Sequence, residues 1–248
     1  MPFADLDKLR LNFGGKVFLM IENMTRQYHS QIKGFIQAGG QSSRMGTDKA
    51  WLEIEGVPMI ERVITAARPV VESLAIIINR DNPQMQRYQK LAGKLNARLI
   101  DDLHHHLGPL GGIHTALSNC QKDVSGLILA CDLPFLTTEF LFLLCQIHQI
   151  ADPQSAIRNP QSITLPVDGE GRLQPLAAVY SNTCLSVVEQ MLADNVLRVD
   201  QLFLRVKPRS VLFKEYAHLL NAERIFQNIN SMEDYQRERV NTKRYRER

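Results

Sequence analysis

Short apolar runs alternate with amphipathic segments through the middle of the chain. We predict strands at residues 32–36, 74–78, 97–100 and 126–131. Between them, apolar residues recur at helical spacing. We predict helices at residues 59–68, 83–92, about 113–120 and from about 138. The apolar runs are continuous, which is typical of strands covered on both faces. Strands separated by helices therefore predict a Rossmann-like, three-layer α/β/α fold with a mainly parallel sheet.

The second half of the chain has a less regular pattern. We predict two strands joined by a turn, then a helix, a short strand and a final helix, at residues 162–167, 176–180, 183–192, 226–230 and from 231. The final helix is expected to begin at Ser231, because Asp234 follows at capping-box spacing.

The two ends of the chain differ from this pattern. Residues 1–31 carry no strong periodicity, and we expect a disordered or extended N-terminal segment there. Arginine is frequent in residues 237–248, which we expect to form a basic C-terminal tail. Residues 32–236 are therefore predicted to form a single domain, whose size allows an ample apolar core.

Composition narrows the function classes. Of the 248 residues, 44% are hydrophobic and 22% are charged, as in ordinary soluble globular proteins. The formal net charge of +3 suits anionic small molecules but is too small to indicate nucleic acid binding. No apolar run approaches the length of a membrane span, and the N-terminus lacks a secretory pattern. We therefore expect neither a nucleic acid nor a membrane partner.

The cysteines bear on location. Four are present, at 120, 131, 145 and 184, and no CxxC pair gives them the spacing of a zinc site. A disulfide framework is not expected in a chain this long. We interpret them as small buried hydrophobic residues in a reducing compartment and expect a cytoplasmic protein.

A glycine loop directly after the first predicted strand is the densest chemical signal. Gly39 and Gly40 let backbone amides approach a ligand closely, and two serines follow them. Arg44 and Lys49 add positive charge. Oriented donors and cations together predict a cradle for a polyphosphate, with an ordinary surface loop as the alternative. The spacing matches neither a Walker A loop nor a GxGxxG fingerprint.

Acidic residues follow two further predicted strands. Asp132 ends an apolar run, where a carboxylate is well placed to hold Mg²⁺ together with substrate phosphates and waters. The alternative role, capping the next helix, can be filled by Thr137 or Thr138. Asp101 and Asp102 end the preceding strand, and either could bind the metal or a ribose hydroxyl, or form a turn. Ligands bind beyond the carboxyl ends of strands in such sheets, so we expect these groups at one site.

Two other motifs lie close by in the sequence. The glycines of Gly108-Pro109-Leu110-Gly111-Gly112 suit either close approach to a ligand at a helix N-terminus or a plain entry from loop to helix. His104-His105-His106 lacks the spacing of zinc ligands, and we interpret it as a solvated loop.

Four segments together support a family resemblance. Residues 37–50 read QAGGQSSRMGTDKA, which resembles the LAGGxSxRMGxDKA signature of the molybdenum cofactor guanylyltransferase family. Three more segments match that family in order: Asp101-Asp102 leading into 108–112, then 131–135, then 226–230. The likeness spans residues 32–236 and implies a nucleotidyltransferase fold.

The resemblance also implies a reaction. Such enzymes transfer GMP from GTP to a molybdopterin-type molybdenum cofactor, with Mg²⁺, and release pyrophosphate. By position, it assigns nucleotide contacts to Gln37, Ala38, Gly39, Gly40, Lys49, Asn79, Asp102 and Asp132, and the acceptor side to Asn228 and Asn230. Lys49, Arg44 and Mg²⁺ at Asp132 would stabilise the charge that develops as pyrophosphate leaves.

Some features qualify the resemblance and leave alternatives. The family's first signature position is commonly Leu, and here Gln37 is interpreted as giving backbone contacts. The nearest alternative is a related nucleotidyltransferase that uses CTP or a sugar phosphate acceptor. A non-catalytic nucleotide or cofactor binding protein is the alternative from another class, but Lys49 and Asp132 are both present. Docking on other cofactor-biosynthesis proteins or molybdoenzymes is a further expectation.

Overall fold

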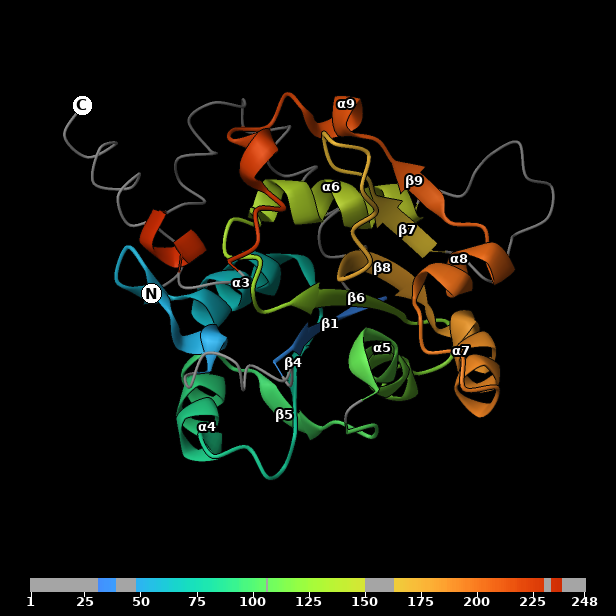
Figure 1. Ribbon diagram of the computed structural model, residues 1–248, viewed down its shortest axis with the longest axis horizontal. Coiled ribbons are helices and arrows are strands. Elements are labelled where there is room, and N and C mark those ends of the chain that lie inside the picture. The colour runs from blue at the N-terminus through green and yellow to red at the C-terminus, as the bar shows by residue number, and fades with distance from the viewer. Residues whose placement is uncertain (1–30, 39–47, 106, 150–162, 230–232, 238–248) are drawn as a thin grey trace.

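The computed structural model describes residues 31–38, 48–105, 107–149, 163–229 and 233–237. A seven-stranded sheet in the order β5-β4-β1-β6-β8-β7-β9 forms its centre (Figure 1). The strands are β1 (Ile32–Gln37), β4 (Leu74–Ile78), β5 (Arg98–Asp101), β6 (Ser125–Ala130), β7 (Ile163–Pro166), β8 (Ala177–Ser181) and β9 (Arg209–Val211). All neighbouring strands pair in parallel except β8, which runs antiparallel to β6 and β7. The predicted mainly parallel sheet is confirmed.

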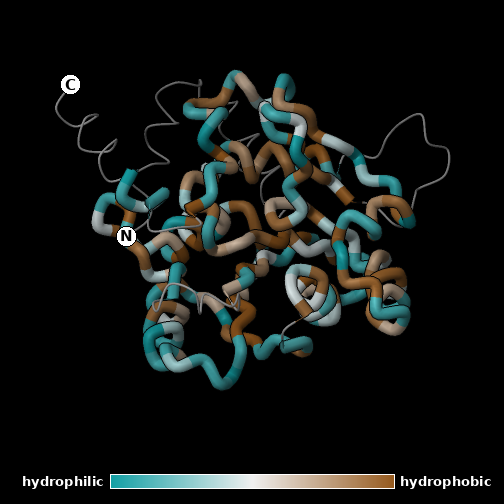
Figure 2. Tube along the Cα trace, in the orientation of Figure 1, coloured by the Kyte–Doolittle hydropathy of each residue, from teal (hydrophilic) through white to brown (hydrophobic). Residues whose placement is uncertain are grey.

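Helices cover both faces of this sheet (Figure 1). One face carries α3 (Met59–Ala67), α4 (Met85–Lys94), α6 (Thr138–Gln149) and α9 (Phe213–Tyr216), and the other carries α5 (Gly108–Ser118), α7 (Leu185–Ala193) and α8 (Asp200–Arg205). Within β4, Ile76 and Ile78 point into the first core, whereas Ala75 and Ile77 point into the second. Side chains alternate along a strand, so a strand apolar throughout needs cover on both sides. The three-layer prediction is confirmed, and Figure 2 shows hydrophobic residues concentrated in the central strands.

Several short elements complete the described part. They are the strands β2 (Glu53–Ile54) and β3 (Val57–Pro58) and the 3₁₀ turns η2 (Lys49–Trp51), η3 (Arg68–Val70), η4 (Asn182–Cys184) and η5 (Ala222–Arg224). β2 and β3 form an antiparallel hairpin whose two turn residues, Glu55 and Gly56, have φ values of 56° and 80°. Both values lie in the left-handed region that a two-residue hairpin of the primed type requires.

Most predicted boundaries agree with the structure. The strand at 74–78 and the helix beginning at Thr138 have the expected limits. The helix predicted from residue 83 begins instead at Met85, because the Asn82 side chain accepts from the Gln84 N–H at 2.8 Å and caps the turn before it. The elements β2, β3, β9 and α8 were not predicted.

The strand predicted at residues 226–230 is wrong for its described part. Residues 226–229 form no strand, and Asn230 lies outside the described residues. Phe226 and Ile229 are buried as anchors, and the Phe226 ring packs edge-on against Phe140 at 5.2 Å. Among the described residues, one backbone hydrogen bond joins this segment to the loop after β6, from the Ile229 N–H to the Asp132 carbonyl at 3.4 Å. The apolar residues of this segment therefore serve packing and do not mark a hydrogen-bonded strand.

The predicted end segments fall largely outside the described residues. This holds for residues 1–30 and 238–248 and for Ser231, the predicted start of the final helix, which the structure shows over 233–237. None of the described helices has the length and apolar character needed to cross a membrane.

Candidate functional site

The carboxyl ends of four parallel strands meet at one edge of the sheet. The last residue of β1, Gln37, pairs with Ile77 in β4 and with Ala130 at the end of β6, and Ile78 pairs with Asp101 at the end of β5. The residues that follow these strands are Ala38, Asn79, Asp102 and Asp132. The structure therefore brings the candidate residues from four strands to one edge, as the sequence pattern predicted.

Lys49 and Asp132 lie close enough to interact electrostatically. Burial raises the pKa of the Asp132 carboxyl, while its own backbone N–H and the Lys49 ammonium lower it. Burial also raises the pKa of the adjacent Cys131 thiol, and Lys49 acts in the opposite direction there too. Among the described residues, no side chain donates a hydrogen bond to the Asp132 carboxylate. A cation and a desolvated carboxylate thus share one end of the sheet.

The turn that carries Lys49 is fixed by Asp48. Asp48 is the N-cap of η2, and its Oδ1 accepts from the Ala50 N–H at 3.1 Å. Its other oxygen accepts from the Tyr88 hydroxyl of α4 at 2.7 Å. No role was predicted for either residue from the sequence pattern. The spacing of Asp48 and Ala50 is that of an Asx cap, but nothing in the sequence indicates a contact 40 residues away.

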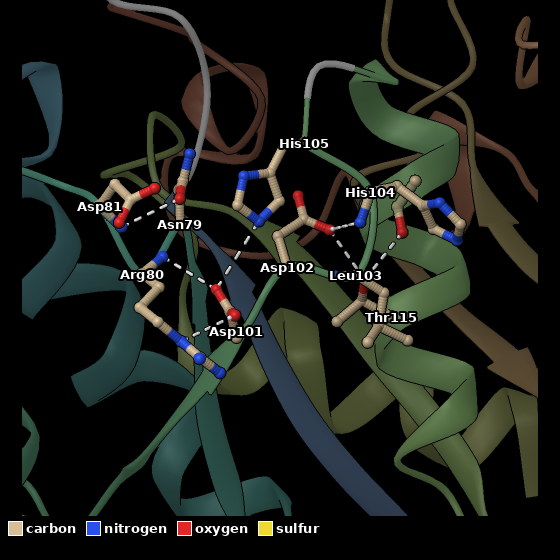
Figure 3. A network of polar contacts seen from close by, with 10 residues as sticks. Asn79, Arg80, Asp81, Asp101, Asp102, Leu103, His104, His105 and Thr115 are labelled. Carbon is tan, nitrogen blue, oxygen red and sulfur yellow. Dashed lines mark hydrogen bonds and ion pairs between the residues drawn. The ribbon is translucent and has the colours of Figure 1, made fainter.

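Adjacent carboxylates at the end of β5 have different partners (Figure 3). Asp101 is engaged by Arg80, whose N–H lies 2.8 Å from Oδ1 and whose Nε lies 3.1 Å from Oδ2. Asp102 accepts at Oδ1 from the Thr115 hydroxyl at 2.8 Å and from the His104 N–H at 3.1 Å. Within the part of the chain that the structure describes, its second oxygen accepts no hydrogen bond. Asp101 is thus occupied in binding Arg80, and Asp102 is the one that presents an oxygen.

Thr115 holds the loop that carries Asp102. It is fully buried in α5, and its oxygen accepts from the Leu103 N–H at 3.0 Å. Its single hydroxyl hydrogen faces both the Asp102 carboxylate at 2.8 Å and the Gly111 carbonyl at 3.1 Å. The carboxylate is the closer and, being charged, the stronger acceptor. This buried hydroxyl therefore connects α5 to two consecutive residues of the loop.

Asn79 has one end of its carboxamide committed. Its Oδ1 accepts from the Asp81 N–H at 3.0 Å (Figure 3). Its backbone carbonyl accepts from the Asn82 N–H at 2.9 Å. These contacts close the turn after β4. Within the described part of the chain, the amide N–H₂ of Asn79 donates no hydrogen bond.

Glycines of the 108–112 segment accommodate neighbouring side chains. The segment is the first turn of α5 and not a loop before it, which corrects the predicted helix start. A Cβ on Gly112 would collide with the carboxamide of Gln37, and one on Gly111 would lie 2.9 Å from the His104 Cβ. The Gln37 amide nitrogen lies 3.5 Å from the Pro109 carbonyl. Gln37 therefore contributes its side chain, besides the backbone contacts predicted for it, to the packing of α5.

The histidine run differs from the predicted solvated loop. His104 is partly buried, and its Nε2 lies 2.9 Å from Nδ1 of His114 in α5. Burial and the neighbouring His104 lower the pKa of His114. His105 is exposed and its Nε2 lies 3.8 Å from Asp101, while His106 is outside the described residues. Within the described ranges, no group of three or more His, Cys, Asp or Glu side chains is arranged to hold a metal ion.

Five candidate residues lie outside the described ranges or close to their ends. Gly39, Gly40, Arg44 and Asn230 fall outside the described residues. Asn228 is exposed and directly precedes Ile229, whose N–H reaches the Asp132 carbonyl. Asn228 therefore belongs to a segment that adjoins the Asp132 loop.

Comparison with known proteins adds a family context. Residues 34–207 match the family model described as MobA-like NTP transferase domain. A probable molybdenum cofactor guanylyltransferase from Clostridium perfringens is 30% identical over 204 residues, which cover 81% of this chain and 92% of that protein.

Two solved structures share the fold. Molybdopterin-guanine dinucleotide biosynthesis protein A from Archaeoglobus fulgidus has a TM-score of 0.67 at 23% identity and covers 85% of this chain and 99% of its own. The 4-diphosphocytidyl-2C-methyl-D-erythritol synthase from Anaerococcus prevotii has a TM-score of 0.63 at 14% identity and covers 88% and 99%. The fold is thus shared with enzymes named for different nucleotides.

Proposed function

Because the chain belongs to the MobA-like NTP transferase family and to the molybdenum cofactor guanylyltransferases within it, we propose that the carboxyl edge of its sheet is where GMP passes from GTP to a molybdopterin-type molybdenum cofactor. The protein is a nucleotidyltransferase, and its other product is pyrophosphate. The observation that carries the proposed location is the proximity of the Lys49 ammonium and the partly buried Asp132 carboxylate at that edge.

Lys49 is assigned to the phosphates of the nucleotide. Its ammonium lies near a partly buried carboxylate, so it is held where bulk water screens charge less effectively. An acceptor phosphate oxygen attacks the α-phosphorus of GTP, the bond from that phosphorus to the bridging oxygen breaks, and the electron pair leaves with pyrophosphate. Lys49 stabilises the charge that builds on the leaving oxygens, and Arg44 is assigned to the same task. No covalent protein nucleophile is required.

Asp132 is assigned to Mg²⁺. Its chemistry fits, because Mg²⁺ in nucleotide enzymes takes one or two carboxylates and completes its shell with phosphates and water. The carboxylate is desolvated and receives no side-chain hydrogen bond from the described residues, so its oxygens remain available. Bound there, the ion would neutralise phosphate charge.

The nucleotide itself is assigned to the neighbouring strand ends. Asp102 offers an oxygen as an acceptor for a hydroxyl or amine, and Asn79 offers an amide donor. Gln37 and Ala38 would run along the nucleotide at the end of β1, followed by Gly39 and Gly40.

Further parts of the proposal concern the acceptor, the partners and the location. Asn228 and Asn230 are assigned to the acceptor side. Handover to other cofactor-biosynthesis proteins or to molybdoenzymes and a cytoplasmic location are also proposed, and all four cysteines are free thiols, as a reducing compartment requires. Residues 32–236 are proposed to act as one domain.

Nucleotide selectivity tests the proposal. Binding of GTP, CTP, ATP and UTP to the full-length protein would be measured by calorimetry with Mg²⁺ and with EDTA. We expect GTP to bind most tightly and Mg²⁺ to strengthen it. A preference for CTP would keep the chemistry but contradict guanylyl transfer. Equal GTP binding with and without Mg²⁺ would contradict the role given to Asp132.

A further inference from the structure

A buried tyrosine on α4 donates its hydroxyl to the residue before Lys49. Tyr88 is fully buried, and its hydroxyl lies 2.7 Å from Oδ2 of Asp48. The hydroxyl of a buried tyrosine can be satisfied by any acceptor. Here the acceptor is a carboxylate, and its charge makes the hydrogen bond stronger. The contact joins the outer helix α4 to the end of the glycine-loop segment, for which phosphate binding is predicted.

Both oxygens of Asp48 are therefore committed. Oδ1 caps η2 through the Ala50 N–H at 3.1 Å, and Oδ2 receives the tyrosine hydroxyl. The Trp51 ring at the other end of η2 packs edge-on against the Tyr88 ring, with centroids 4.9 Å apart. The Arg87 guanidinium covers the Trp51 ring at 4.0 Å. The short turn that carries Lys49 is thus held by α4 at both of its ends.

We propose that Asp48 and Tyr88 are positioning residues that orient Lys49 toward the Asp132 end of the sheet. Asp48 needs no contact with substrate for this role, since its two oxygens are already satisfied by protein donors. An ammonium on a flexible stem gains from a fixed backbone origin, because misplacement by about 1 Å can cost a reaction roughly 100-fold. The inference rests on the proposed role of Lys49 in the transfer.

The test compares two buried tyrosines. Tyr88→Phe removes the hydroxyl that reaches Asp48, and Tyr180→Phe removes an equally buried hydroxyl that donates to the Pro175 carbonyl at 2.7 Å. We expect similar small losses of Tm in both variants. Only Tyr88→Phe should lower kcat/KM for GMP transfer, by about tenfold, with kcat falling more than KM rises.

A double-mutant cycle separates this inference from the proposal beneath it. Tyr88→Phe would be measured alone and in a Lys49→Ala background, where it should cause no further loss because it acts through Lys49. Asp48→Asn keeps the capping oxygen but replaces the charged acceptor of the Tyr88 hydroxyl with an amide donor, so the charge-assisted bond is lost and kcat/KM should fall in the same direction as in Tyr88→Phe.

Three results would overturn the inference. Equal activity of the Tyr88→Phe and Tyr180→Phe variants, with Lys49→Ala impaired, would make Tyr88 a purely structural residue. Full additivity with Lys49→Ala would show that Tyr88 acts elsewhere. An unimpaired Lys49→Ala variant would remove the proposed function of Lys49 and this inference with it.

Discussion

Polar groups lie at both ends of strand β6, but their surroundings differ. At its amino end, the ring of His148 lies between two hydroxyls, with Nε2 2.9 Å from Ser125 and Nδ1 2.9 Å from Thr164. At its carboxyl end, Asp132 has the Lys49 ammonium nearby and receives no hydrogen bond from a described side chain. Burial lowers the pKa of His148 to about 4 and raises that of Asp132. In both places burial disfavours the charged form.

The difference lies in how that cost is offset. The partly buried imidazole of His148 has hydrogen-bond partners within the protein for both of its nitrogens, so its contribution is to stability. A desolvated carboxylate without such partners is incomplete, and a ligand can supply what is missing. We therefore predict that substitutions at the carboxyl end of β6 reduce activity and preserve stability. Substitutions at the amino end should change stability and preserve activity.

The largest expected effect is at Asp132. Asp132→Asn should lower kcat by roughly 1,000-fold, about 4 kcal/mol, because the amide cannot replace the carboxylate as a magnesium ligand. Its Tm without nucleotide should stay equal or rise, because a desolvated charge is removed. The measurements are steady-state kinetics and calorimetric melting of the same preparations. Near-normal turnover would contradict the metal assignment.

The converse change is at His148. The His148 imidazole binds a proton near pH 6.5 in the unfolded chain but only near pH 4 in the folded chain. Acidification between these two pH values therefore favours unfolding. His148 should therefore remove roughly 3 kcal/mol of folding stability between those pH values. Urea unfolding of the wild type and of His148→Gln across this range measures the difference in slope. Parallel curves would contradict the assignment, and kcat of the variant near neutral pH should be unchanged.

The two ends of β6 were also predictable to different degrees. The run of apolar residues followed by Asp132 is a local pattern, and it correctly gave the strand and the position of the carboxylate at the sheet edge. His148 was not singled out, because its partners lie 23 and 16 residues away in the sequence and meet it only in the folded protein. Local patterns reveal strand ends, whereas hydrogen-bond partners depend on tertiary structure.

The same distinction explains the errors elsewhere. β9 has only three residues, of which one is buried, so it gives almost no hydrophobic pattern. The segment 226–229 gives a strong pattern, but Phe226 packs against Phe140 of α6 and Ile229 clusters with Ile54 and Met59, and the segment pairs with no described strand. The choice between Asp101 and Asp102 needed the position of Arg80, and the contact of Tyr88 with Asp48 needed that of α4.

Lys49 near the carboxyl edge of the sheet can be compared with Lys33 at the amino end of β1. Lys49→Ala should lower kcat/KM by about 100-fold, or roughly 2.7 kcal/mol, as expected for loss of a charge contact to the transition state. Lys33 is near the amino end of β1, where its charge acts on the Cys120 thiol. Lys33→Ala should leave the kinetics unchanged. Equal losses in the two variants would show that net charge, and not position at the carboxyl edge, controls the rate.

The smallest predicted effect concerns how Asp102 is held. Thr115→Val preserves the shape of the buried side chain but removes the hydroxyl that binds Asp102 Oδ1 and the Leu103 N–H. We expect KM for GTP to rise about tenfold, or roughly 1.4 kcal/mol, with kcat nearly unchanged, because the loop loses its fixed orientation before the nucleotide binds.

Thr115→Ser separates this effect from packing. Serine retains the hydroxyl and loses a methyl group in the core, so it should lower Tm yet keep KM within about twofold of wild type. If the valine and serine variants raise KM equally, the loss comes from repacking of α5 and not from release of Asp102. If only valine raises KM, a buried hydroxyl outside the site sets the position of a carboxylate within it. The carboxyl end would then depend on the same kind of satisfied polar contact that stabilises the amino end.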